Sequence, residues 1–181
     1  QVVVSIMDIV LGMRARGLHM PAVLRIRNLL DHRIKVLNES FALAIEQGGY
    51  QNNYRGVFPI KVNQQCHVIE EIADYGRRYH HGLEAGSKAE LLIALSLVDD
   101  PEALLICNGY KDQRYIETAI LARRLGRQPV VVIEQADEVE RIINASLELG
   151  AAPLIGIRAK LSARSTGRWG SSVGERAKFG L

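Results

Sequence analysis

The chain has little of what disulfide-rich, metal-binding or membrane proteins need. It holds only two cysteines, Cys66 and Cys107, in 181 residues. They follow no metal-ligand spacing and are too few for a disulfide scaffold, which favours a reducing cytoplasm and two buried structural thiols. No apolar stretch approaches the roughly 20 residues of a membrane-spanning helix. The sequence therefore predicts a cytoplasmic protein that does not bind a membrane.

An excess of one charge is also absent. The net charge is +3, with 23 Lys and Arg residues scattered among 20 Asp and Glu residues. This balance of charges gives no strong indication that the protein binds nucleic acid. The pair His80–His81 does not predict a metal site, because adjacent strand residues point to opposite faces. With 48% hydrophobic residues, the composition is typical of a soluble globular chain that is large enough for one sizeable core.

The two ends of the sequence suggest a piece of a longer protein. The apolar start from Val2 to Leu11 carries Asp8 and lacks a basic leader, so we do not expect a signal peptide. The first residue is Gln1 rather than Met, and the chain stops abruptly after Lys178–Leu181. We expect residues 1–27 to be an N-terminal segment that leads into a domain formed by residues 28–181.

Hydrophobic periodicity predicts a helix followed by alternating strands and helices. From residue 28 to residue 47, one helical face carries Leu30, Ile34, Leu37, Phe41 and Ile45. Short apolar segments then recur about every 25 residues, the length of one strand, one helix and two loops. These predicted strands are 57–62, 81–85, 103–107, 129–133 and 153–157.

Local signals support the helices between these strands. Ser87 and Glu90 read as a capping box that opens a helix, with each side chain satisfying a free backbone N–H group. Gly126 and Gly150 lie where two later helices should stop. Near-continuously apolar strands joined through helices imply a parallel sheet of the α/β class, either a (β/α) barrel or an open doubly wound sheet.

A polar or charged residue closes each predicted strand. The residues are Lys61, Glu84, Asn108, Glu134 and Arg158. In a barrel the carboxyl ends of the strands surround one active-site mouth, so these side chains would converge; in an open sheet only those beside a switch point would. Strand ends also reach the surface, where polar residues are common. The pattern alone leaves both interpretations open.

Lys61 is the most informative residue, because it follows an apolar segment just before a helix. A desolvated lysine amine loses its proton more easily and can form a Schiff base with an aldehyde. A lysine at a strand end can also simply extend to water. Pro59 within the same predicted strand removes one ladder hydrogen bond, which a local bulge would accommodate.

The segment from Leu161 to Ala177 changes to Ser, Gly and Arg and includes Trp169. It matches neither a Walker sequence nor a dinucleotide fingerprint, so we do not expect it to cradle a nucleotide. At a barrel mouth such a loop can cover substrate, and a plain surface loop is the other interpretation.

Four motifs together resemble the biosynthetic arginine decarboxylases of bacteria and plants, in order and spacing, from about Ile6 to the last residue. They are GVFPIKVNQQ at 56–65, GLEAGSKAEL at 82–91, CNGYKD at 107–112 and KFGL at 178–181. The family belongs to the alanine-racemase-like pyridoxal-phosphate enzymes. The resemblance implies a partial (β/α)8 TIM-type barrel, truncated before its last strands.

The resemblance also implies roles for three residues. Lys61 matches the lysine that binds pyridoxal 5'-phosphate as an aldimine and acts in catalysis. Glu84 matches an acidic residue near the cofactor, and Arg158 matches a basic residue on the fifth strand. The phosphate-binding loop, the ring-stacking histidine and the partner of the pyridine nitrogen would lie beyond Leu181, so we expect this chain alone to be inactive. Because an incomplete barrel exposes the edges of its sheet, we also expect the isolated chain to be poorly soluble or molten.

The implied reaction converts L-arginine to agmatine and carbon dioxide, an early step towards putrescine and spermidine. The resemblance further implies a homo-oligomeric full-length enzyme and is compatible with a bound magnesium ion. Two other classes compete: a non-catalytic pyridoxal-phosphate barrel protein, and a binding module without cofactor in which Lys61 is a solvated strand end. A related diaminopimelate or ornithine decarboxylase is a further alternative.

Overall fold

Five parallel strands form the centre of the molecule in the computed structural model, which describes residues 3–160 and 180–181. The strands are β1 (Val57–Pro59), β2 (Gly82–Ala85), β3 (Leu104–Cys107), β4 (Gln128–Ile133) and β5 (Leu154–Ile157). Their order in the sheet is the same as their order in the chain. A doubly wound sheet would reverse this order at a switch point. The described part of the chain is therefore a partial (β/α) barrel, as predicted.

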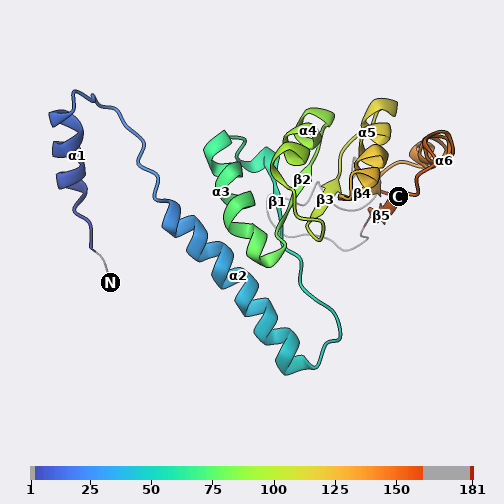
Figure 1. The fold of residues 1–181 in the computed structure, drawn as a ribbon, viewed down its shortest axis with the longest axis horizontal. Coiled ribbons are helices and arrows are strands. Elements are labelled where there is room, and N and C mark those ends of the chain that lie inside the picture. The colour runs from blue at the N-terminus through green and yellow to red at the C-terminus, as the bar shows by residue number, and fades with distance from the viewer. Residues whose placement is uncertain (1–2, 161–179) are drawn as a thin grey trace.

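Helices connect the strands and lie along one face of the sheet (Figure 1). They are α3 (Cys66–Gly76), α4 (Lys88–Leu97), α5 (Gln113–Arg124) and α6 (Asp137–Leu149). The predicted starts and stops are confirmed. Ser87 Oγ accepts the Glu90 N–H at 3.3 Å at the start of α4, and Gly150 ends α6 in the left-handed conformation with φ of 59°.

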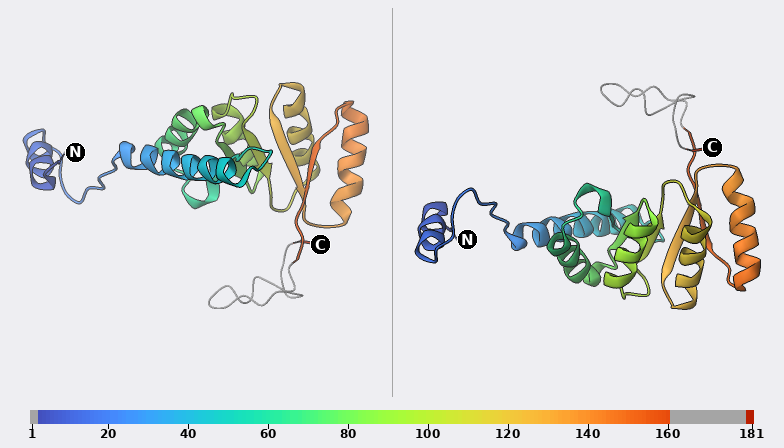
Figure 2. Two further views of the ribbon diagram at one scale, coloured as in Figure 1. Left: turned by 90° about the horizontal axis from the view of Figure 1, so that it is seen from below. Right: turned by 90° about the horizontal axis from the view of Figure 1, so that it is seen from above.

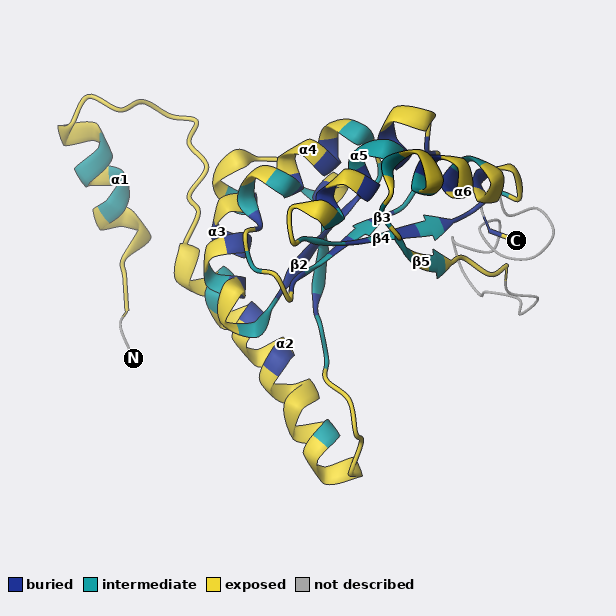
Figure 3. Ribbon diagram, turned by 45° about the vertical axis from the view of Figure 1, so that its right-hand side comes forward, coloured by how far each residue is buried: buried dark blue, intermediate teal, exposed yellow. Residues whose placement is uncertain are grey.

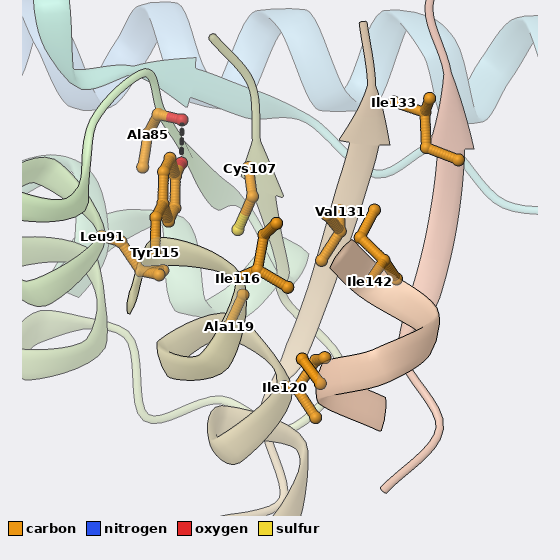
Figure 4. Close-up of a cluster of buried hydrophobic side chains, with 11 residues drawn as sticks. Ala85, Leu91, Cys107, Tyr115, Ile116, Ala119, Ile120, Val131, Ile133 and Ile142 are labelled. Carbon is orange, nitrogen blue, oxygen red and sulfur yellow. Dashed lines mark hydrogen bonds between the residues drawn. The ribbon is translucent and has the colours of Figure 1, made fainter. Parts of the chain in front are cut away.

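Two buried clusters hold these helices on the sheet. In the cluster of Figure 4, α5 and α6 place Ile116, Ile120 and Ile142 against β3 and β4. Full burial of each such side chain contributes roughly 1.5–3 kcal/mol. The Tyr115 hydroxyl donates to the Ala85 carbonyl oxygen at 2.7 Å, which ties α5 to the carboxyl end of β2.

The second cluster joins α3 and the long helix α2 (Arg27–Gly48) to the same face of the sheet, at β2 and β3. Ile34 of α2 is buried there, as the periodicity predicted. Leu37 and Phe41, on the same predicted helical face, are 43% and 45% exposed. Phe41 instead stacks on Tyr54, with ring centroids 4.0 Å apart.

The N-terminal helix α1 (Ile6–Ala15) was not predicted and buries none of its residues. It begins at Ser5, whose hydroxyl oxygen accepts the Asp8 N–H at 3.3 Å. Figures 2 and 3 show α1 standing apart from the sheet and its helices. Its apolar residues Ile6 and Met7 are 73% and 65% exposed. The fold of the described residues is thus centred on the sheet and α2 to α6.

The two cysteines differ in their exposure to solvent. Cys107 is buried, but the prediction of a buried thiol is wrong for Cys66, which is exposed at the start of α3 and donates to Glu70 at 3.1 Å. The predicted loop from Leu161 to Ala177 lies outside the described residues. Among the helices that are described, none combines the length and the apolar character needed to cross a membrane.

Candidate functional site

An open cavity of about 530 Å³ lies at the carboxyl ends of the strands. Apolar side chains from β1, β3, β4 and β5 form its walls, and four polar side chains reach it. The residues around it are Val57, Pro59, Lys61, Glu84, Ile106, Asn108, Val132, Ile157 and Arg158. Because parallel strands end at the same edge, residues separated by almost 100 positions in sequence meet here.

Lys61 reaches the cavity from a 3-10 turn rather than from a strand. The strand β1 ends at Pro59, and Lys61 lies in the turn η1 (Ile60–Val62) that follows. The predicted strand 57–62 was therefore too long. The bulge expected at Pro59 is not needed, because Pro59 is the last residue of β1, and β1 is an edge strand of the described sheet. The Lys61 side chain is 65% exposed, so the desolvated environment expected for it is not formed by the described residues.

Glu84 of β2 lies beside Lys61 on one side of the cavity. The Lys61 Nζ atom lies 3.7 Å from Glu84 Oε1, which also accepts a hydrogen bond from Asn108 Nδ2 at 3.2 Å. Because Lys61 is largely exposed, this ion pair contributes no more than about 1 kcal/mol to stability. The Glu84 Oε2 atom is buried and has no hydrogen-bond partner among the described residues. A buried acceptor of this kind is suited to a ligand that donates a hydrogen bond.

Arg158 and Glu134 form the opposite side of the site. Arg158 directly follows β5, and its Nη1 atom lies 3.2 Å from Glu134 Oε2. The other carboxylate oxygen, Glu134 Oε1, accepts the Gly109 N–H at 2.7 Å. The Glu134 side chain is only 1% exposed and does not line the cavity. Four of the five predicted strand-end residues thus line one cavity. The fifth, Glu134, contacts Arg158, which lines the cavity.

The loop after β3 depends on Gly109. This residue has φ of 77°, a conformation that costs other residues energy. A Cβ atom at Gly109 would lie 2.5 Å from the Gly86 carbonyl oxygen, so the space also excludes a side chain. The Asn108 N–H donates to the Ala85 carbonyl oxygen at 2.9 Å, which continues the pairing of β2 with β3. Gly109 therefore lets this loop approach the loop after β2.

A buried ion pair below the site was not predicted. Lys111 Nζ lies 3.1 Å from Glu138 Oε1, and neither side chain is exposed. The Glu138 carboxylate also accepts the N–H groups of Lys111 and Glu134, at 3.3 and 2.8 Å. A sequence signal did exist, because Glu138 shares the buried stripe of α6 with Ile142 and Ala145. A glutamate at such a position needs a buried partner.

The last two residues of the chain lie beside the site. The Gly180 N–H donates to the Glu134 carbonyl oxygen at 3.2 Å, and the Leu181 N–H donates to the Arg158 carbonyl oxygen at 2.8 Å. The Lys160 N–H donates back to the Leu181 carbonyl oxygen at 2.8 Å. The end of the KFGL motif thus supports the backbone on both sides of the Glu134–Arg158 ion pair.

Neither thiol nor phenol chemistry fits the groups near the carboxyl end of β3. Burial raises the pKa of the Cys107 thiol to about 12, so it is protonated at neutral pH and is not a nucleophile. Burial also raises the pKa of Tyr115. Among the described residues that line the cavity, Lys61 carries the only amine.

Comparison with known proteins shows the family of this chain. The family model described as "Pyridoxal-dependent decarboxylase, pyridoxal binding domain" matches residues 34–181, which include every strand of the sheet. The chain belongs to this decarboxylase family. The matched range also contains Lys61, Glu84 and Arg158, although the match itself assigns no role to them.

Relatives within the family are similar over almost the whole chain. The biosynthetic arginine decarboxylase of Synechococcus sp. (strain RCC307) is 68% identical over 98% of this chain and 28% of the relative. That of Prochlorococcus marinus (strain MIT 9303) is 66% identical over 98% of this chain and 27% of the relative. The chain thus spans little more than a quarter of the length of these curated decarboxylases.

A solved structure shares the fold as well. The crystal structure of the biosynthetic arginine decarboxylase from Campylobacter jejuni matches with a TM-score of 0.84 and 34% identity. The match covers 97% of this chain and 28% of that decarboxylase. The partial barrel is therefore the fold of the corresponding part of a decarboxylase, and the assignment to a barrel rather than to an open sheet agrees with it.

Proposed function

We propose that this chain is the lysine-bearing part of an enzyme that decarboxylates L-arginine to agmatine and carbon dioxide with pyridoxal 5'-phosphate. The observation that carries the proposal is the meeting of the Lys61 amine and the Glu84 carboxylate at the mouth of a barrel of this family. The names of the relatives, at 68% and 66% identity, support arginine as the substrate. The product would feed putrescine and spermidine synthesis.

The residues of the cavity fit the cofactor chemically. Lys61 supplies a primary amine for an aldehyde, and Arg158 supplies a cation for an anionic group. The unpartnered Glu84 Oε2 offers an acceptor, and apolar side chains such as Ile106 and Val132 suit an aromatic ring. We therefore assign the cofactor to Lys61, Glu84 and Arg158, with Lys61 as the catalytic residue.

When bound, pyridoxal phosphate supplies an electron sink for the electron pair left by departing carbon dioxide. The residues of this chain would hold and orient it. Lys61 would hold the cofactor through its side-chain amine. Glu84 holds the lysine ammonium nearby by charge attraction, and the Asn108 amide orients Glu84. Arg158 directs positive charge into the cavity, where it can neutralise a bound anion.

The proposal extends to properties of the whole enzyme. We assign residues 28–181 to the cofactor-binding barrel and residues 1–27 to a segment leading into it. A cytoplasmic location and a homo-oligomeric assembly rest on the resemblance to the biosynthetic enzymes. Within residues 3–160 and 180–181, no group of three His, Cys, Asp or Glu side chains could hold a metal ion. A magnesium ion is therefore supported by the resemblance alone.

Activity of the full-length protein tests the proposal. Carbon dioxide release should depend on added pyridoxal phosphate and should be much faster with L-arginine than with ornithine or diaminopimelate. Release from one of the other two substrates alone would identify a related decarboxylase. Cofactor binding without release from any of the three would favour a non-catalytic barrel protein, and no cofactor binding would favour a binding module.

A further inference from the structure

Glu134 links two parts of the site without lining the cavity itself. Its carboxylate spans from the Gly109 N–H, at 2.7 Å from Oε1, to Arg158 Nη1, at 3.2 Å from Oε2. The first contact fixes the loop that carries Asn108, and the second fixes a cation at the cavity. One buried side chain therefore determines the positions of two groups that face the site.

The surroundings of Glu134 hold it in place. Its side chain is 1% exposed, and its own N–H donates to Glu138 Oε2 at 2.8 Å. Its carbonyl oxygen accepts the Gly180 N–H at 3.2 Å. A side chain fixed in this way can orient its partner without moving towards it, because both its backbone groups and both its carboxylate oxygens are occupied.

Arg158 is the more exposed partner of the pair. Its side chain is 49% exposed, and a long side chain so open to solvent samples many rotamers unless a fixed group restrains it. A carboxylate restrains a guanidinium more strongly than a neutral acceptor does, because the hydrogen bond is charge-assisted. The charge of Glu134, rather than its shape alone, is thus suited to keep Arg158 directed at the cavity.

We propose that Glu134 is a positioning residue that prepares Arg158 to bind the anionic cofactor. This inference rests on the proposed function, which assigns Arg158 to cofactor binding. Glu134 does not touch the cofactor; it acts through Arg158. The effect of removing its charge should therefore disappear once Arg158 is itself replaced.

A double-variant comparison on the full-length apoenzyme tests this dependence. Pyridoxal phosphate is titrated by absorbance into the wild type, Glu134→Gln, Arg158→Gln and the double variant. Glu134→Gln keeps an acceptor for the Gly109 N–H but loses the charge. It should weaken binding about tenfold, the scale of a charge-assisted hydrogen bond that becomes neutral. The double variant should match Arg158→Gln within about twofold.

Two controls separate positioning from damage to the fold. Glu140→Gln, at an exposed glutamate of α6, should keep the wild-type affinity, and the thermal transition of each apoenzyme monitors folding. If Glu134→Gln does not fold, Glu134→Asp takes its place, since the shorter carboxylate keeps the charge but cannot span both partners. Glu134→Asp should then weaken cofactor binding when Arg158 is present and should have no further effect when Arg158 is replaced by Gln.

The outcomes distinguish this inference from the proposed function. Losses that multiply in the double variant, or a wild-type affinity for Glu134→Gln, would overturn the role of Glu134 while leaving the cofactor assignment of Arg158 intact. A wild-type affinity for Arg158→Gln would instead overturn the assignment of Arg158, and the inference with it. Loss of arginine decarboxylation as a function would be seen separately, in the carbon dioxide assay.

Discussion

Lys111 and Glu138 form an ion pair at 3.1 Å in which both side chains are completely buried. Lys111 Nζ also donates to the Gly109 carbonyl oxygen at 2.6 Å, and the Glu138 carboxylate accepts the backbone N–H groups of Lys111, Glu134 and Gln135. The pair therefore connects the loop after β3 with the first turn of α6. The loop after β3 carries Asn108, and Glu134 lies between β4 and α6 with its N–H on Glu138, so the geometry of the site depends on this connection.

Replacement of Lys111 by methionine should destabilise the protein strongly. The Lys111→Met variant leaves the Glu138 carboxylate buried without its counter-charge, which typically costs about 3–5 kcal/mol. Urea denaturation of the full-length protein measures the change. Lys35→Met removes an exposed lysine of α2 and should change stability by less than about 0.5 kcal/mol. Equal effects of the two variants would contradict the importance of the buried pair.

Gly109 should tolerate a side chain far less well than Gly126, although both have φ of 77°. The Gly126→Ala variant has open space around the new Cβ atom and should cost about 1–2 kcal/mol for the left-handed backbone alone. Gly109→Ala adds a contact at 2.5 Å with the Gly86 carbonyl oxygen. It should cost more and should also weaken cofactor binding. Matching values of the unfolding free energy for the two variants would show that the loop after β3 moves away from Gly86 without an energetic cost.

His81 should make stability fall as the pH drops below neutral. Burial lowers its pKa from the usual 6.5, and its Nδ1 atom has no hydrogen-bond partner among the described residues. The unfolded chain therefore binds the proton better than the folded chain. The contribution is complete above about pH 6.5 and is lost as the pH falls towards the lower, folded-state pKa.

Urea midpoints of the full-length protein between pH 8 and pH 5 measure this effect. The His81→Phe variant cannot titrate at this position, so its stability should depend less on pH than that of the wild type. His19→Phe, at an exposed histidine, should keep the wild-type dependence. If the His81→Phe profile is as steep as the wild-type profile, other groups cause the loss of stability.

Much of the fold could be predicted from short-range patterns. The apolar segments located all five strands, and Ser87 and Gly150 marked helix ends, because these signals act within a few residues. The extent of β1 was wrong, since only the pairing of Pro59 with Glu84 shows where that strand ends. The exposure of Leu37 and Phe41 could not be predicted either, because it depends on which elements α2 contacts.

The candidate site was predictable in location but not in its connections. Strand-end positions named Lys61, Glu84, Asn108 and Arg158, and parallel topology brings such positions together. Their roles in binding and catalysis stay predictions. The bridge made by Glu134 and the ion pair of Lys111 required the structure, because each depends on contacts between loops more than 20 residues apart.

The covalent attachment of the cofactor to Lys61 is the central claim, and peptide mapping tests it directly. The full-length protein is incubated with pyridoxal phosphate, reduced with borohydride, digested and analysed by mass spectrometry. We expect the reduced cofactor on the peptide that contains Lys61, its loss in Lys61→Ala, and its retention in the control Lys88→Ala. Stable labelling of another lysine, with Lys61 unmodified, would contradict the account.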